Sequence, residues 1–178
     1  QRFRLERVSR NPAVFDEQKL RHFNGHWLRS LSVEELTRRL EEYTGRGGLR
    51  PAVEISAEKI QTLADFWPLV SFLYEGPVDD PAAFQKTLCR DGGPDSLEAA
   101  RDALASVEPF TLEGIEGALR EVVERLGVKP GRVFQPVRVA IAGTTVSPGI
   151  FESVAVLGRD ETLARIDRAL ERARATCP

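Results

Sequence analysis

Residues 111–127, TLEGIEGALREVVERLG, hold a helix start, an apolar helical stripe and a helix end in one run. Thr111 can accept a hydrogen bond from a free N–H of the first turn, and Gly127 favours the left-handed conformation that ends many helices. The apolar residues recur at spacings of three and four, which places them on one face. They are Leu112, Ile115, Leu119, Val122, Val123 and Leu126. A helix with such a face packs against other elements, so this run predicts a helical bundle.

Helical patterns also precede this run. The stretch 15–31 predicts a helix with one apolar face buried in a core. That face consists of Leu20, Phe23, Trp27 and Leu31. Ser32 and Glu35 have the spacing of a capping box, which predicts a helix that begins there and ends at the glycines Gly45, Gly47 and Gly48. One long helix is expected over 56–74, because its apolar residues form a broad face.

Further helical patterns follow it. They cover residues 81–90, 96–107, 131–143, which Pro136 interrupts, 150–157, and the stretch from Asp160 onward. In the last helix we expect the arginines to stay in water, namely Arg165, Arg168, Arg172 and Arg174. No pair of alternating strands with a two-residue turn is found, so the predicted fold class is all-α. Residues 75–81, EGPVDDP, predict the boundary between two successive bundles.

Composition narrows the class of protein. No apolar run approaches the roughly 20 residues of a membrane span, and the first residues lack the apolar stretch of a signal peptide, so we expect a soluble cytoplasmic protein without a membrane partner. Cys89 and Cys177 have no CxxC partner, and neither a disulfide framework nor a zinc site is expected. Methionine is absent and the chain begins with Gln1, which favours an excised fragment.

The net charge of −2 conceals an uneven distribution. Residues 1–50 carry 11 Lys+Arg against 7 Asp+Glu, residues 51–124 carry 5 against 15, and residues 125–178 carry 9 against 5. The segment 125–151 contains four cations and no acidic residue, in a chain that is 29% charged. A polyanion, if one binds, is therefore expected at this segment.

Sequence patterns of catalytic sites are absent. The chain has no GxSxG, no Walker-type glycine loop and no HExxH, so no catalytic residue is assigned. His22 and His26 have the i, i+4 spacing of a metal pair, but no third ligand lies nearby in sequence. We therefore expect no metal site. The glutamates of 113–124 have the spacing of a solvated helix face, which favours that role over paired catalytic carboxylates.

The segment 129–151 differs from these patterns, because cations, glycines, prolines and hydroxyls fall around two predicted helix ends without a carboxylate. Such ends present free N–H groups to an anion or a base edge. Arg138 stands among Val137, Val139 and Ala140, where an unpaired guanidinium is costly. It must therefore either form an internal salt bridge or emerge at a binding site.

Two strings resemble bacterial glutamyl-tRNA synthetases, which are class I aminoacyl-tRNA synthetases. FRLERV at 3–8, followed by NPAVFDEQKLRHFNGHWLR, is similar to the region after their catalytic domain. LGVKPGRVFQPVRVAIAGTTVSPGIFESVAVLGRDETLARIDRAL at 126–170 resembles their C-terminal part. From 77 to 109 the resemblance is only one of helical pattern.

The resemblance implies a fold and a function. Residues 1–25 would be the tail of a stem-contact segment, 26–76 a first helical anticodon-binding bundle, and 77–178 a second, C-terminal one. The chain would bind the anticodon arm of tRNA without catalysing a reaction. The catalytic domain of the same polypeptide, absent from this chain, would bind ATP and Mg²⁺ and carry out glutamylation, so no cofactor is expected here.

The resemblance also implies site residues. Arg138 would contact the first anticodon base, and the loop of Ser147, Pro148, Gly149 and Ile150 would pack around the anticodon bases. Lys129 and Arg132 are expected to contact phosphate, which we infer from their charge and place.

Lys59 stands where the resemblance implies a contact to the third anticodon base, which differs between glutamate and glutamine tRNAs. Lysine keeps the charge of the arginine found there in discriminating relatives but lacks its flat, two-pronged donor edge. Whether glutamine tRNA is accepted therefore stays open, and lysine favours relaxed discrimination.

Two other classes of function were weighed. One is a helical protein-interaction domain derived from this family without RNA binding, whose affinity would hardly respond to salt. The other is a small autonomous enzyme, which the lack of a nucleophile, base and orienting group disfavours.

Overall fold

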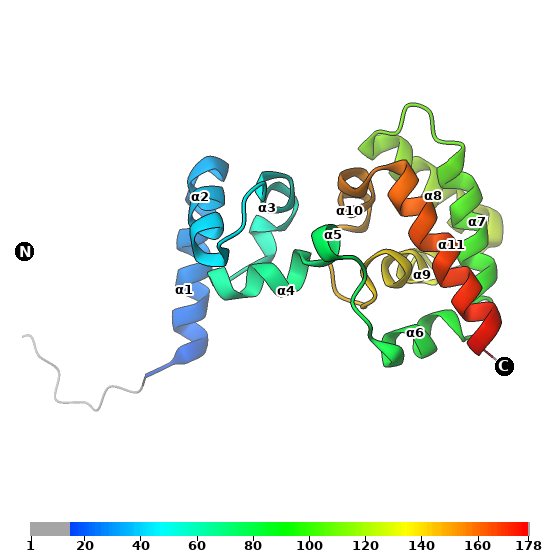
Figure 1. Ribbon diagram of the computed structural model, residues 1–178, viewed down its shortest axis with the longest axis horizontal. Helices are drawn as coiled ribbons and strands as arrows, with labels where there is room; N and C mark the ends of the chain where they lie inside the picture. The colour runs from blue at the N-terminus through cyan, green and yellow to red at the C-terminus, as the bar shows by residue number, and fades with distance from the viewer. Residues whose placement is uncertain (1–14, 178) are drawn as a thin grey trace, which may run out of the picture.

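The computed structural model describes residues 15–177, and every regular element in that range is helical (Figure 1). The prediction of an all-α fold is confirmed. The predictions for residues 1–14, which include most of the stem-contact tail, concern residues outside the described range. Within residues 15–177 no helix combines the length and the apolar character needed to cross a membrane.

The helices form two groups, which lie side by side along the long axis of the molecule (Figure 1). The first comprises α1 (Glu17–Arg29), α2 (Val33–Thr44), α3 (Arg50–Ser56), the 3₁₀ turns η2 (Ala57–Lys59) and η3 (Leu63–Asp65), α4 (Phe66–Val70) and α5 (Phe72–Glu75). The second comprises α6 (Pro81–Leu88), α7 (Gly93–Ala105), α8 (Leu112–Leu126), α9 (Gly131–Ala142), α10 (Ile150–Leu157) and α11 (Arg159–Thr176).

Each group has its own buried apolar cluster. The first cluster runs from Leu28 to Val70, and the second begins at Phe72 and extends to Ala173. Leu73 packs against both clusters, so α5 is the element at which the two cores meet. The division of the chain at 76 and 77 stays a prediction.

Helix ends in α2 and α8 follow the predicted signals. Ser32 Oγ accepts from the Glu35 N–H at 3.2 Å, and Thr111 accepts from the Gly114 N–H. The glycines after both helices adopt the left-handed conformation. The reciprocal half of the capping box at Ser32 is wrong, because the Glu35 carboxylate accepts hydrogen bonds from Arg38 and Arg39 instead. These hydrogen bonds lower the pKa of Glu35 to about 2.

The single helix expected over 56–74 is also wrong. The chain forms η2, an extended residue at Ile60, then η3, α4 and α5. Ile60 is fully buried, and Thr62 and Asp65 form a capping box that starts a new turn. Burial of Ile60 in an extended conformation outweighs the local helical pattern, because tertiary packing overrides propensity.

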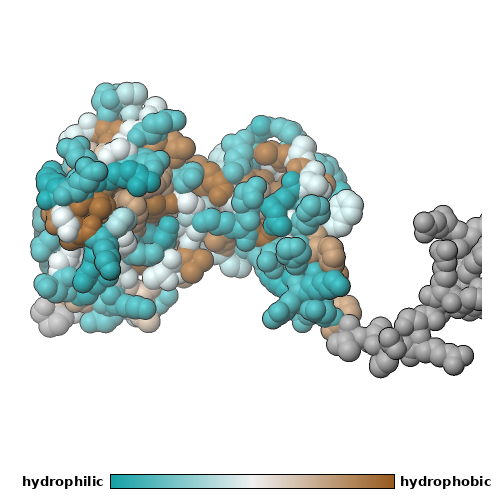
Figure 2. All heavy atoms as spheres, turned by 180° about the vertical axis from the view of Figure 1, so that it is seen from behind, coloured by the Kyte–Doolittle hydropathy of each residue, from teal (hydrophilic) through white to brown (hydrophobic). Residues whose placement is uncertain are grey.

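The apolar stripe of α1 does not face the core. Leu20 is 53% exposed, Phe23 51% and Trp27 68%, whereas Gly25 and Leu28 are buried. Leu31, the fourth residue of the predicted stripe, packs against the first cluster. The helix docks through a different face and leaves Leu20, Phe23 and Trp27 exposed. Figure 2 shows apolar surface interspersed with hydrophilic residues on this group of helices.

Cys89 and Cys177 form a disulfide, which corrects the expectation of none. Cys89 follows α6 and Cys177 follows α11, so the bond joins two helix ends across 88 residues of sequence. Sequence spacing did not reveal the pair, because only the packing of the second bundle brings the two helix ends together.

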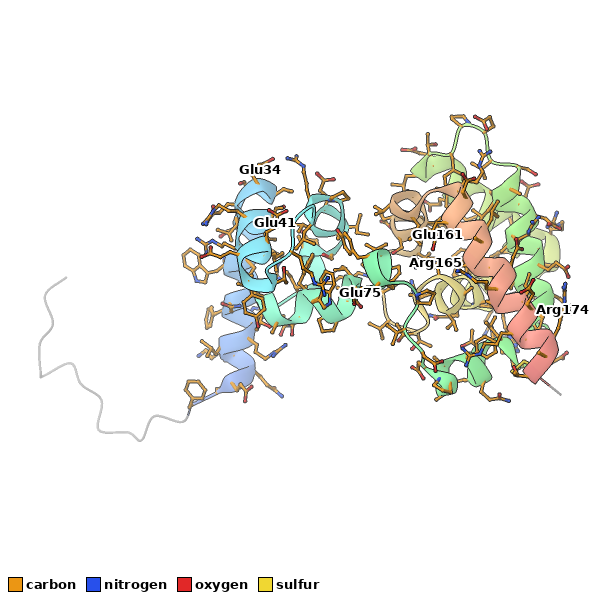
Figure 3. All side chains as sticks on the ribbon, viewed as in Figure 1. Glu34, Glu41, Glu75, Glu161, Arg165 and Arg174 are labelled. Atoms are coloured by element: carbon orange, nitrogen blue, oxygen red, sulfur yellow. A yellow bond between two sulfur atoms is a disulfide. The ribbon has the colours of Figure 1, made fainter. Side chains whose placement is uncertain are left out.

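Arg165 corrects the expectation that the arginines of α11 stay in water. Its side chain is 4% exposed, and Figure 3 shows it pointing from α11 toward the middle of the molecule. Nη1 donates at 2.7 Å to the Phe72 carbonyl of α5 and at 2.7 Å to the Ile141 carbonyl of α9. Nε pairs with Glu161 at 2.6 Å. One buried guanidinium thus joins the last turn of α9 to the end of the first group of helices.

Replacing Arg165 with methionine is expected to lower the free energy of unfolding by about 2–4 kcal/mol, because two buried carbonyl groups lose their donor. Urea unfolding measures the change. Arg168→Met is the matched control, since Arg168 lies one turn away and is 64% exposed. Its expected effect is within about 0.5 kcal/mol. Equal stability of the two variants would contradict the role assigned to Arg165.

Candidate nucleic-acid interface

Lys59 extends from the end of η2, at a point where the backbone changes direction. The buried hydroxyl of Ser56 donates to the Ala52 carbonyl at 2.6 Å as α3 ends. After one 3₁₀ turn the chain becomes extended at Ile60, whose side chain is fully buried. Ser56 and Ile60 are both buried, and the Lys59 side chain between them is exposed at the edge of the first group of helices.

The segment after Lys59 is held by Asp65. Its carboxylate accepts from the backbone N–H groups of Gln61 at 3.0 Å and Thr62 at 2.9 Å, and it pairs with Arg21 of α1 at 2.9 Å. Burial acts to raise the pKa of Asp65, but these hydrogen bonds outweigh it and lower the pKa. Because the carboxylate is ionised and multiply bonded, the backbone that carries Lys59 has a defined position.

Arg138 lies on α9 between two buried valines and is itself half-buried. Its Nε donates to Ser147 Oγ at 2.9 Å. No carboxylate among the described residues forms an ion pair with it, so the internal salt bridge considered from the sequence is not found. Burial lowers the pKa of this guanidinium, because its charge is removed from water and no described carboxylate pairs with it.

Ser147 connects the two cations. Its hydroxyl accepts from Arg138 and donates to the Pro148 carbonyl at 2.9 Å, while its own carbonyl accepts from Lys59 Nζ at 3.1 Å. Ser147 is 5% exposed. One cation from each group of helices therefore meets at one buried serine, and Lys59 lies 88 positions from that serine in sequence.

The loop that carries Ser147 begins at Gly143. This glycine has a φ of 77°, and a side chain there would collide with the Val78 carbonyl. The Val78 N–H donates to the Ala142 carbonyl at 2.9 Å. The chain between the two groups of helices thus packs directly on the start of the loop, and only glycine fits at that contact.

The structure brings together some of the predicted residues and separates others. Lys59, Arg138 and Ser147 converge. Pro148 is buried and Ile150 is 5% exposed, so both support the loop from inside. Gly149 is the N-cap of α10, where an added Cβ would overlap the Glu152 carboxylate.

The exposed tip of the loop is formed by Thr145 and Val146, which the sequence analysis did not single out. Val146 is 65% exposed. In the sequence, the sign of this exposed position is Val146, an apolar residue two positions before Pro148-Gly149.

Lys129 and Arg132 lie at the other end of α9. Both are exposed, and Arg132 Nη1 donates to the Asp91 carbonyl at 3.4 Å. Six residues of helix separate Arg132 from Arg138, a rise of about 9 Å. The two cations therefore belong to a second surface and do not line the Ser147 site.

The chain matches a known protein family. The family model described as "Anticodon binding domain" matches residues 27–170. The chain belongs to the anticodon-binding domain family. It is 36% identical to glutamate-tRNA ligase 1 of Caldanaerobacter subterraneus subsp. tengcongensis, over 95% of this chain and 37% of that protein. It is 40% identical to the glutamate-tRNA ligase of Acidothermus cellulolyticus, over 94% of this chain and 36% of that protein. The sequence resemblance to this family is confirmed.

The anticodon-binding fold is also found in solved structures. A glutamate tRNA ligase from Elizabethkingia meningosepticum, crystallised with its amino acid, superposes with a TM-score of 0.79 at 20% identity. The match covers 95% of this chain and 35% of that one. This anticodon-binding chain thus spans somewhat more than a third of the length of the curated relatives described above.

Replacing Ser147 with alanine is expected to lower the free energy of unfolding by about 1–2 kcal/mol, because Arg138 Nε loses its acceptor in a half-buried position. Urea unfolding tests this. Ser106→Ala is the control, since its exposed hydroxyl donates to the Asp102 carbonyl at the end of α7. The prediction fails if Ser147→Ala is no less stable than the control.

Proposed function

We propose that this chain is the tRNA-binding part of a glutamate-tRNA ligase and that it binds the anticodon arm of glutamate tRNA. The observation that carries the proposal is Arg138, a half-buried guanidinium held by Ser147 without a carboxylate partner among the described residues. An uncompensated charge of this kind is costly to fold, and a nucleotide base or phosphate compensates it. Membership of the anticodon-binding family supports the same ligand.

The geometry of Arg138 suits recognition of a base edge. Within residues 15–177 only Nε is engaged, by Ser147, which leaves the outer N–H groups of the guanidinium for a ligand. Unpaired bases of RNA are recognised through hydrogen bonds to their edges and through stacking. Because Nε is already held, less side-chain freedom is lost when a base binds. The exposed tip at Thr145 and Val146 would then lie against the neighbouring nucleotides.

We further propose that the catalytic part of the same polypeptide lies outside this chain. Glutamate, ATP and Mg²⁺ would bind there, because these 178 residues contain no Walker-type glycine loop for a nucleotide. The curated relatives described above are glutamate-tRNA ligases of which this chain spans 36–37%. The compartment proposed for the full-length protein is the cytoplasm.

Arg138→Ala is expected to weaken binding to the glutamate anticodon stem-loop by about 1–3 kcal/mol, the usual cost of losing a specific base contact. Fluorescence anisotropy with a labelled stem-loop measures the loss, and circular dichroism should show unchanged helical content. Stem-loops with unrelated anticodons provide the comparison. An equal loss on all of them would show that Arg138 does not contact a base.

Lys59 is proposed to relax the discrimination between glutamate and glutamine tRNAs. Its ammonium is a single point charge that already donates to the Ser147 carbonyl. Unlike a guanidinium, it cannot form a planar bidentate pair of hydrogen bonds with a base. The full-length enzyme is expected to charge both tRNAs, and Lys59→Arg should reduce charging of glutamine tRNA relative to glutamate tRNA. Aminoacylation of the two purified tRNAs tests this. Strict rejection of glutamine tRNA by the unaltered enzyme would contradict it.

A further inference from the structure

A group of cations near the start of α9 lacks carboxylate partners within the described residues. Its members are Arg90, Lys129 and Arg132, none of which forms an ion pair there. Several other arginines of the second bundle are paired, as in Arg101 with Asp167 and Arg120 with Glu116. Arg90 lies in segment 51–124, where 15 Asp+Glu stand against 5 Lys+Arg, and its lack of an ion pair among the described residues requires an explanation.

Arg90 is the most constrained member of the group. It lies in the turn between α6 and α7 and is half-buried. Its Nε and Nη2 are shielded from solvent and have no hydrogen-bond partner among residues 15–177. Buried donors without an acceptor cost free energy, and an anion that accepts from them would offset that cost.

Arg132 lies over the same turn. Its Nη1 donates to the Asp91 carbonyl at 3.4 Å, which brings a second guanidinium next to Arg90. Burial first, and the charge of Arg132 second, lower the pKa of Arg90. Two like charges held together, one of them with buried donors, form an arrangement that an anion relieves.

We propose that Arg90 and Arg132 bind a phosphate group of the RNA backbone, at a subsite separate from the base-contacting residues around Ser147. This inference rests on the proposed function. Guanidinium groups suit phosphate because their planar donor sets bind its oxygens in pairs. Arg132 and Lys129 are exposed, so an extended ligand can reach the turn from solvent.

The position of this subsite fits one continuous strand. Arg132 lies about 9 Å along α9 from Arg138. A few nucleotides of one strand can span this distance, and proteins that bind single strands contact several nucleotides at once. Phosphate contacts orient a nucleic acid without selecting its sequence, whereas base contacts select it. We therefore expect Arg90 and Arg132, near the start of α9, to orient the RNA, and Arg138, farther along α9, to select the base.

The test uses the 178-residue chain and labelled anticodon stem-loops. Arg90→Gln is expected to weaken binding roughly 3- to 10-fold, by a similar factor for every anticodon. The slope of log affinity against log salt should fall by about 0.7, as expected for one phosphate contact to a single strand. Arg38→Gln is the control, because Arg38 is exposed and already paired with Glu35 and Glu42. It should leave both affinity and slope unchanged.

Stability separates a binding role from a structural one. Arg90→Gln should not lower the Tm, because it removes an unpartnered charge and relieves its repulsion with Arg132. A clear fall in Tm would instead show that Arg90 holds the fold and would overturn the proposal as argued from Arg90. Arg132→Gln provides the second variant, because its side chain is exposed, and it should weaken RNA binding in the same anticodon-independent way.

The remaining outcomes are also decisive. Unchanged RNA binding by both variants, together with weakened binding by Arg138→Ala, would overturn this subsite and leave the proposed function intact. Loss confined to one anticodon would mean a base contact and not a phosphate contact. If inorganic phosphate raises the Tm of the unaltered chain while both variants bind RNA normally, the site holds an adventitious ion only, and the proposal fails. A chain that binds no stem-loop at all would contradict the proposed function itself.

Discussion

The buried guanidinium of Arg165 is the interaction on which the arrangement of the molecule depends. It donates to two buried carbonyl groups, that of Phe72 in α5 and that of Ile141 in the last turn of α9. Because α5 ends the first group of helices and α9 leads into the loop at Ser147, this single residue fixes the loop relative to the first group. Glu161 balances its charge at 2.6 Å.

The candidate site is a consequence of that arrangement. Lys59 belongs to one group of helices and Arg138 to the other, and they meet only because the loop between Gly143 and Ile150 lies against both. Gly143 permits the close approach of Val78, and Ser147 uses its hydroxyl for one cation and its carbonyl for the other. The site therefore lies at the junction of the two groups, where each contributes a positive charge and neither contributes a carboxylate to these contacts.

Local signals predicted local structure well where no distant residue competed. The helix from Thr111 to Gly127 has the cap and the end that its sequence indicates. Of its predicted stripe, Ile115, Leu119 and Val122 are buried, whereas Leu112 and Leu126 near the two ends are exposed. Prediction failed where burial depended on a distant partner. Ile60 is buried in an extended conformation within an apparent helical pattern, and the stripe containing Trp27 is exposed because α1 docks through Gly25 and Leu28 instead.

By itself, the sequence determined the all-α class, most helix ends and the carboxylate-free segment 125–151, because these depend on spacing, composition and short-range hydrogen bonds. The family followed from the resemblance of stretches of the sequence to glutamyl-tRNA synthetases. Only the tertiary structure decided that Lys59 and Arg138 share Ser147, that Arg165 is buried, and that Cys89 meets Cys177. Each of these pairs residues far apart along the chain, and their proximity follows from how the helices pack. Periodicity indicates which face of a helix is apolar, but not which surface covers that face.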